Sequence, residues 1–158
     1  KNYLFKNSPW EESARIPLIF KLPNQIVGTL VDQPVSLIDI FPTLTDLCNL
    51  KGDYRKNKEG GDMGGYSLKP LLYGNGKWQG PNGALTLVGN NGHSKSENEQ
   101  TYSYRTHQFR LIRYGNGKKE LYDHHNDPHE WQNIANNKKN KKLIQQLNNE
   151  MDNILINR

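Results

Sequence analysis

The sequence lacks several features that would define its compartment or its chemistry. It contains a single cysteine, Cys48, so no disulfide can form within the chain. Its longer apolar runs, at 16–20 and 35–41, are interrupted by Pro17 and Asp39 and fall far short of the roughly 20 residues of a membrane span. We therefore expect no membrane partner, and we expect Cys48 to be a small apolar residue of the core.

The sequence also lacks an initiator methionine and a recognisable leader segment. Residue 1 is Lys rather than Met, and no basic and then apolar leader precedes the rest of the chain. We expect the N-terminus to be a truncation point, so the sequence alone leaves export undecided.

The charge balance favours an anionic partner. The 158 residues carry a formal net charge of +5, which suits nucleic acid, anionic lipid or acidic polysaccharide. Basic and aromatic residues are not interleaved, so nucleic acid is not expected. The densest basic group lies at the start of the last predicted helix, where we interpret it as a solvated face; it consists of Lys138, Lys139, Lys141 and Lys142.

The first half of the sequence predicts one strand and one helix. Residues 16–23 form a short apolar run bounded by prolines, which is typical of a buried strand. Ser36 and Asp39 have the spacing of a capping box, and the apolar residues that follow recur with helical periodicity. We expect a helix from there to about Asn49, with Pro42 at a kink or among its first residues.

The second half predicts an antiparallel sheet with a covering helix. Four segments have the composition of strands: 83–89, 101–106, 109–114 and 119–122. Asp127 and Pro128 have the residue types that begin a helix, so a short helix is expected there. A terminal helix has its apolar face marked by Leu143, Leu147, Met151 and Ile154 or Leu155. The architecture is therefore α+β, in two pieces.

Four motifs follow one another over nearly the whole chain. They are KNSPWEESARIPLI at 6–19, VSLIDIFPTL at 35–44, GYSLKPLL at 65–72 and ELYDHHNDPHEWQN at 120–133. Together, and in this order, they resemble the C-terminal portion of the sulfatase family of the alkaline phosphatase superfamily, in particular its iduronate-2-sulfatase-like branch.

The resemblance implies an α+β fragment. Residues 1–75 would contain the last strand and helix of the sulfatase α/β catalytic domain. Residues 76–158 would form the small C-terminal subdomain, an antiparallel four-stranded sheet with a C-terminal helix. The reading of the chain from its own patterns agrees with this division.

The resemblance also implies an activity that this chain cannot perform alone. Sulfatases hydrolyse sulfate esters, here of a sulfated sugar or polysaccharide, with a formylglycine made from Cys or Ser in a Cys/Ser-x-Pro/Ala-x-Arg motif and with a calcium ion. Cys48 does not fit that motif, because Leu50 and Gly52 stand where Pro and Arg would be required. Formylglycine and calcium would belong to a missing N-terminal sulfatase region, which is thus an expected partner. A periplasmic or secreted location is implied by the family.

The resemblance assigns one residue to sulfate binding and three to the rim of a substrate pocket. Lys6 matches the family's sulfate-contacting Lys, and a compact ammonium suits that role. His93, Arg105 and His107 are candidates for the pocket rim, where Arg suits sulfate or carboxylate recognition. No catalytic nucleophile is expected in this chain.

A histidine-rich segment at 124–130 suggests a metal site, which we do not predict. His125 and His129 are four residues apart, and His124 is adjacent to them. Asp127 and Glu130 are interpreted as helix-capping residues, and no cysteine completes a zinc set. The sequence therefore predicts no metal ligand here.

Two other functions share these motifs or this charge. A phosphonate monoester hydrolase or phosphodiesterase of the same superfamily would have the late motifs and would differ in its upstream nucleophile. A non-catalytic module that binds sulfated glycans would bind sulfated oligosaccharides without turnover.

Overall fold

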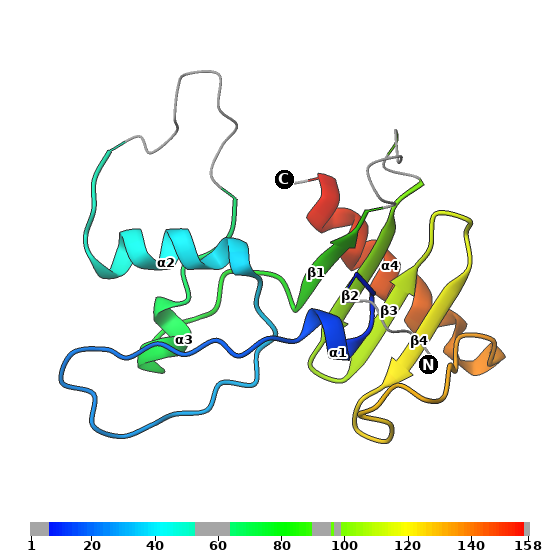
Figure 1. Ribbon diagram of the computed structural model, residues 1–158, viewed down its shortest axis with the longest axis horizontal. Helices are drawn as coiled ribbons and strands as arrows, with labels where there is room; N and C mark the ends of the chain where they lie inside the picture. The colour runs from blue at the N-terminus through cyan, green and yellow to red at the C-terminus, as the bar shows by residue number, and fades with distance from the viewer. Residues whose placement is uncertain (1–6, 53–63, 90–95, 97–98, 157–158) are drawn as a thin grey trace.

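The computed structural model describes residues 7–52, 64–89, 96 and 99–156. Figure 1 shows a four-stranded sheet between two helices, α1 and α4, and beside it a more open part that contains α2 and α3. The helices are α1 (Glu11–Ala14), α2 (Ile40–Leu47), α3 (Lys69–Tyr73) and α4 (Lys141–Ile156), and the strands are β1 (Gly83–Val88), β2 (Thr101–Thr106), β3 (Phe109–Arg113) and β4 (Lys119–Asp123).

The sheet is an antiparallel meander in the order β1-β2-β3-β4, which confirms the predicted arrangement. Tyr104 of β2 pairs with Leu85 of β1 on one side and Leu111 of β3 on the other, and Leu111 pairs with Leu121 of β4. Because side chains alternate along a strand, these apolar residues all lie on the same face. The opposite face, here called the polar face, carries polar residues such as Ser103 and Arg110 together with the buried Ile112.

Helix α4 covers the apolar face of the sheet, as its periodicity predicts. Leu147 and Met151 are buried there, and Leu143, Ile154 and Leu155 pack around them. The core that results consists of Leu85, Tyr102, Tyr104, Leu111, Leu121, Leu147 and Met151. It gives the meander the covered apolar face that an isolated sheet of this size requires.

The capping box predicted at the start of the first long helix is formed. Asp39 is buried, and its carboxylate accepts hydrogen bonds from the backbone N–H of Ser36 and of Tyr66, each at 2.8 Å. A 3-10 turn at Leu37–Asp39 leads into α2, with Pro42 as its third residue. The helix ends at Leu47, and its C-cap residue Cys48 is exposed rather than in the core as expected.

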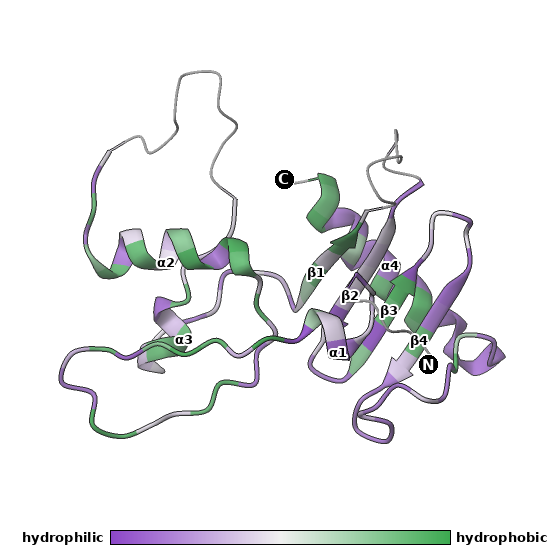
Figure 2. Ribbon diagram, in the orientation of Figure 1, coloured by the Kyte–Doolittle hydropathy of each residue, from purple (hydrophilic) through white to green (hydrophobic). Residues whose placement is uncertain are grey.

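The strand predicted at 16–23 is absent from the structure. The segment is extended without pairing, and most of its apolar side chains face solvent, with Ile19 exposed to 87%, although Leu22 is buried. Further along, Ile26 is likewise exposed to 95% and Leu30 to 85%. Figure 2 shows hydrophobic stretches along this long segment, outside the sheet. A strand needs a neighbour to bond its N–H and C=O groups, and no described residue supplies one. The prediction was wrong for this chain, and the division at residue 75 stays a prediction.

The short helix predicted from Asp127 is also absent. The Asp127 carboxylate does accept backbone hydrogen bonds, from Trp131 N at 3.0 Å and Gln132 N at 2.7 Å, but within a turn. Glu130 has a left-handed φ of 56°, which ends any helical path. This conformation turns the Glu130 side chain into the interior, so Glu130 is not a helix-capping residue.

We expect the chain to associate with itself when it is produced alone, because exposed apolar segments of this size favour aggregation. Replacing Ile19, Ile26 and Leu30 with Lys should yield a predominantly monomeric chain, measured by size-exclusion chromatography with light scattering. A control chain with Gln79→Lys, Gln132→Lys and Asn136→Lys adds the same charge at exposed polar positions. A monomeric unmodified chain, or equal improvement in the control, would contradict this expectation.

Candidate functional site

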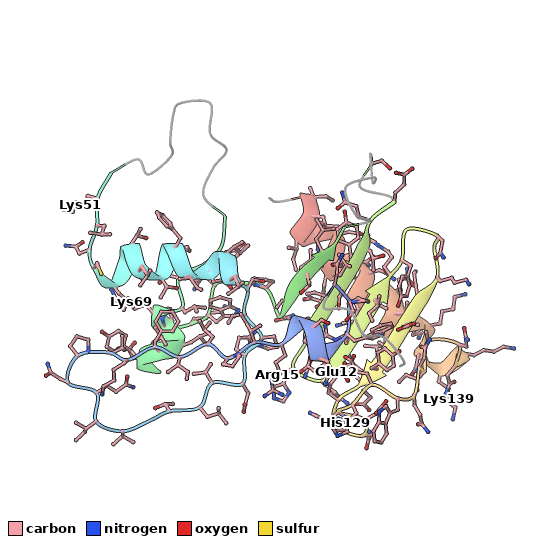
Figure 3. The ribbon with its side chains drawn as sticks, viewed as in Figure 1. Glu12, Arg15, Lys51, Lys69, His129 and Lys139 are labelled. Atoms are coloured by element: carbon pink, nitrogen blue, oxygen red, sulfur yellow. The ribbon has the colours of Figure 1, made fainter. Side chains whose placement is uncertain are left out.

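The segment from Asn7 to Arg15, which follows the predicted sulfate-binding Lys6, lies on the polar face of the sheet. Helix α1 forms its middle part, in front of the sheet and opposite α4 in Figure 1. Figure 3 labels Glu12 and Arg15 of this segment, whose side chains are exposed to solvent. The N-terminal segment is therefore attached to the small sheet rather than to α2 and α3.

Arg110 of β3 is the centre of this attachment. Its side chain is only 1% exposed, and its guanidinium donates to carboxylate oxygens of both Glu11 and Glu130. A further nitrogen, Nη1, donates to Ser103 Oγ at 2.7 Å and to the carbonyl oxygen of Pro9 at 3.3 Å. All three guanidinium nitrogens thus have acceptors, which a buried arginine requires.

Glu130 is fully buried and accepts hydrogen bonds at both carboxylate oxygens. Oε2 accepts from the backbone N–H of Glu11 at 3.0 Å, and Oε1 accepts from His124 Nε2 at 2.8 Å as well as from Arg110. Burial by itself raises the pKa of this carboxyl. The hydrogen bond from His124, the charge of Arg110 and the Glu11 N–H outweigh it and lower the pKa of Glu130 to about 2.

Arg105 of β2 completes the group. Its Nε lies 3.4 Å from Glu11 Oε2, and its side chain is 20% exposed. Burial lowers the pKa of Arg105, and the nearby Glu11 carboxylate acts against that shift. We call the whole group the Arg110 cluster; its members are Glu11, Ser103, Arg105, Arg110, His124 and Glu130.

The cluster and its neighbours bind three consecutive residues of the N-terminal segment. The Pro9 carbonyl accepts from Ser103 Oγ at 2.6 Å, and the Trp10 indole N–H donates to Glu120 Oε2 at 2.9 Å. Glu11 is bound through both its backbone N–H and its carboxylate, as described above. The path of the chain just after Lys6 is therefore set by side chains of β2, β3, β4 and the 124–130 turn.

Of the four residues predicted for sulfate binding and the pocket rim, the structure describes two. Lys6 and His93 lie outside the described residues. Arg105 belongs to the Arg110 cluster, whereas His107 is exposed in the β2–β3 turn, with its ring centroid 5.6 Å from that of His125. The assignment of these residues to a pocket rim stays a prediction, because no described residue forms the rest of such a pocket.

Three members of the cluster have ligand atoms close enough for a metal ion. Atoms of Glu11, His124 and Glu130 lie within 4.8 Å of one another. Calcium, however, takes six to eight oxygen ligands, and here a nitrogen would replace one of them. Arg110 already forms ion pairs with both carboxylates at the same place. These residues do not fit calcium, so none of them is assigned as a ligand of that ion.

Reasoning from the sequence missed the Arg110 cluster. The available signal was Arg110 beside the apolar pair Leu111 and Ile112, in a strand whose other residues suit a core. A charged residue in such a strand indicates a partner on the same face, but its partners are 20 and 99 residues away. Nothing local in the sequence identifies Glu11 and Glu130 as those partners.

Acid is expected to destabilise the chain through Glu130. The pKa of Glu130 is lower in the folded state than in the unfolded state. Its contribution to the free energy of unfolding is therefore complete above pH 4.5 and is lost as the pH falls from there to about 2. The difference corresponds to roughly 3 kcal/mol of unfolding free energy. Urea denaturation of the monomeric triple-lysine chain at several pH values would measure this slope.

The Glu130→Gln variant should lose most of that acid slope. The matched control is Asp46→Asn, which breaks an exposed ion pair with Lys69, 2.9 Å long, and should leave the slope nearly unchanged. An identical slope in wild type and Glu130→Gln would show that the Glu130 carboxylate does not have the lowered pKa.

Comparison with known proteins gives a consistent family. The model of the family described as N-sulphoglucosamine sulphohydrolase, C-terminal, matches residues 2–157. A sulfatase of Formosa agariphila is 33% identical over 147 residues, which are 93% of this chain and 26% of that protein. Human arylsulfatase K is 31% identical over 136 residues, 83% of this chain and 24% of the human protein. The chain thus spans about a quarter of the length of these curated relatives.

Solved structures share the fold. BT1596, a 2-O GAG sulfatase, matches 82% of this chain and 27% of its own, with a TM-score of 0.63 and 23% identity. BT4656, solved with its substrate D-glucosamine-2-N,6-O-disulfate, matches 73% of this chain and 22% of its own, with a TM-score of 0.57 and 26% identity. Since the family model covers nearly all residues and the meander and α4 agree with it, this chain belongs to the sulfatase family, as its C-terminal portion.

Proposed function

We propose that this chain is the C-terminal part of an enzyme that hydrolyses sulfate esters of a sulfated sugar or polysaccharide. The observation that carries the proposal is the family match over residues 2–157. The relatives found by sequence are named as sulfatases, and this chain spans about a quarter of their length. The carbohydrate complex of BT4656 supports a sulfated sugar as the class of substrate. We also propose that the enzyme belongs to the iduronate-2-sulfatase-like branch of the family.

The nucleophile and the metal are proposed to lie in the region that precedes this chain in the whole protein. A hydrated formylglycine supplies a strong oxygen nucleophile, and calcium neutralises charge on the sulfate oxygens. No described residue of this chain is given either role. The chain alone is therefore expected to be inactive.

Lys6 is proposed to bind the sulfate group of the substrate. An ammonium group has three N–H donors and a charge that can follow the equatorial oxygens of a sulfate ester. His93, Arg105 and His107 are proposed at the rim of the substrate pocket. For Arg105, this role would compete with its contact to Glu11.

The proposed location is periplasmic or secreted, which fits a polysaccharide substrate outside the cytoplasm. Within the described residues, none of the helices has the length and apolar composition needed to cross a membrane.

A phosphonate monoester hydrolase is the nearest alternative. The enzyme of Agrobacterium radiobacter shares the fold, with a TM-score of 0.60 at 22% identity over 75% of this chain. Such a likeness concerns the fold alone, whereas the relatives found by sequence are sulfatases. We therefore favour sulfate over phosphonate esters.

The proposal is tested with the chain expressed together with the reading frame that precedes it. Purified protein should release inorganic sulfate from 4-nitrophenyl sulfate and from D-glucosamine-2-N,6-O-disulfate, faster than it cleaves a phosphonate monoester. The matched control replaces the Cys or Ser of the upstream Cys/Ser-x-Pro/Ala-x-Arg motif with Ala. An upstream frame without that motif, or preferred cleavage of the phosphonate, would refute the proposal, and binding of sulfated oligosaccharides without turnover would indicate a glycan-binding module.

A further inference from the structure

We propose that the stacked side chains of His129 and Trp131, in the turn that follows β4, are a sugar-binding site: the outer face of the Trp131 indole binds a ring of the polysaccharide other than the ring whose sulfate is cleaved. Both residues belong to the part of the chain that the structure describes. The choice of ligand rests on the polysaccharide substrate given under Proposed function. We call the two residues the His129–Trp131 pair.

Trp131 differs in its exposure from the other two tryptophans of the chain. Trp10 is half-buried and donates its indole N–H to Glu120 Oε2 at 2.9 Å. Trp78 is half-buried as well and donates to the Pro81 carbonyl at 2.9 Å. Trp131, in contrast, is 77% exposed. Because tryptophan normally contributes to a fold by burying its large apolar ring, packing does not account for Trp131.

Trp131 is also isolated from other exposed apolar side chains. Among the described residues from 99 to 155, it is the only large hydrophobic residue that is exposed. A stable protein interface takes about 800 Å² of each partner and has an apolar centre. One indole among polar residues does not provide such a surface, whereas it matches the size of a single sugar ring.

The local structure explains why both rings of the pair point outward. Glu130 lies between them in the sequence, has the left-handed φ of 56°, and buries its side chain against Arg110. Its two neighbours are exposed, and their rings stack with centroids 5.0 Å apart and an interplanar angle of 24°. The Trp131 backbone N–H donates to Asp127 Oδ1 at 3.0 Å. Since the ring is held before the ligand arrives, binding costs less conformational entropy.

The chemistry of the pair suits the apolar face of a sugar. The face of an indole carries the negative part of the ring quadrupole, which attracts the C–H groups on one face of a pyranose. The exposed amide of the next residue, Gln132, can donate to sugar hydroxyls and accept from them. The Asp127 carboxylate is bonded to the backbone of Trp131, so its charge disfavours a sulfate group at the same place.

Binding is measured with the full-length protein, which is this chain with the reading frame that precedes it. The upstream Cys or Ser nucleophile is replaced with Ala to prevent turnover, and the probe is an octasaccharide of heparan sulfate. Trp131→Ala is expected to raise the dissociation constant about 10-fold, which is typical for the loss of an aromatic stacking partner. Trp131→Phe keeps an aromatic face and should raise it by no more than about threefold.

Two comparisons separate the pair from the catalytic site and from a general effect of removing an aromatic ring. The single sugar D-glucosamine-2-N,6-O-disulfate should bind Trp131→Ala within about twofold of the unsubstituted protein, because one ring does not reach both places. The matched control is Tyr73→Ala, since Tyr73 of α3 is another exposed aromatic residue, at 52%. It should leave octasaccharide binding within about twofold. Thermal unfolding shows that each variant is folded.

Hydroxyl-radical footprinting of the same inactive protein locates the contact. Trp131 is expected to be oxidised in the absence of ligand and to be protected by the octasaccharide. If Trp131 is already protected without ligand, another part of the protein covers it, and the sugar-binding role is overturned.

The outcomes distinguish this proposal from the proposed function. Equal octasaccharide dissociation constants with and without the Trp131→Ala change, or no octasaccharide binding at all, would overturn the sugar-binding role while wild-type sulfate release keeps the proposed function. Equal weakening for the single sugar would place Trp131 at the catalytic site and overturn a separate binding site. A wild-type protein without turnover would refute the proposed function, and weaker octasaccharide binding by its Trp131→Ala variant would still support the pair.

Discussion

Replacing Arg110 with Met is expected to lower the free energy of unfolding by about 3–5 kcal/mol, the largest loss for any single substitution considered. Met replaces the Arg110 side chain only as far as Nε, so the loss comes mainly from the charge and hydrogen bonds of the guanidinium. The carboxylates of Glu11 and Glu130 would face each other without the guanidinium that pairs with both. The Pro9 carbonyl and Ser103 hydroxyl would each lose an N–H donor.

Urea denaturation of the monomeric triple-lysine chain, followed by tryptophan fluorescence, measures this loss. Arg113→Met is the matched control, because Arg113 is a neighbour on the same strand, is 25% exposed, and pairs with the half-exposed Asp152. Its loss should not exceed about 1 kcal/mol. Equal losses in the two variants would mean that the buried ion pairs of Arg110 contribute no more than a surface pair does.

Replacing Lys6 with Ala in the full-length protein is expected to lower kcat/KM for a sulfate ester by about 100- to 1,000-fold. This is the range found when one preorganised donor to a developing negative charge is removed. The loss should appear for 4-nitrophenyl sulfate as well as for the disulfated sugar, because the contact proposed for the ammonium is with the sulfate group that both share. Release of inorganic sulfate under initial-rate conditions measures it.

A lysine far from the N-terminal segment provides the control. Lys139 lies in the 3-10 turn Lys138–Asn140 just before α4 and projects away from the sheet (Figure 3), and Lys139→Ala should leave kcat/KM within about twofold of wild type. Lys6→Arg keeps the charge but not the compact shape of the ammonium, so intermediate activity is expected. If Lys6→Ala kept the kcat/KM of wild type, Lys6 would not be a sulfate-binding residue.

The local patterns of the sequence were sufficient for the meander. Each of the four strands predicted for the meander, including 101–106, agrees with an observed one to within a residue, because alternation and turn residues are local signals. Helix α4 has Leu147 and Met151 buried as its periodicity predicts. The capping box at Ser36 formed for the same reason, since its two partners are three residues apart.

The errors fall where distant residues decide the conformation. The segment 16–23 has the composition of a strand, yet strand pairing depends on a neighbour that the described chain does not contain. The turn at Asp127 carries helix-start residues, but Glu130 reaches Arg110 and Glu11 instead of continuing a helix. A buried ion pair outweighs the weak helical preference of four residues.

The sequence by itself determined the family, through four ordered motifs, and the small sheet with its covering helix, through short-range periodicity. Only the tertiary structure placed Glu11 beside Glu130, which is 119 residues away along the chain, with Arg110 between them. Motifs and periodicity record what neighbouring residues favour. The pairing of buried charges depends instead on which side chains the folded backbone brings within hydrogen-bond distance. No local pattern in the sequence specifies those side chains.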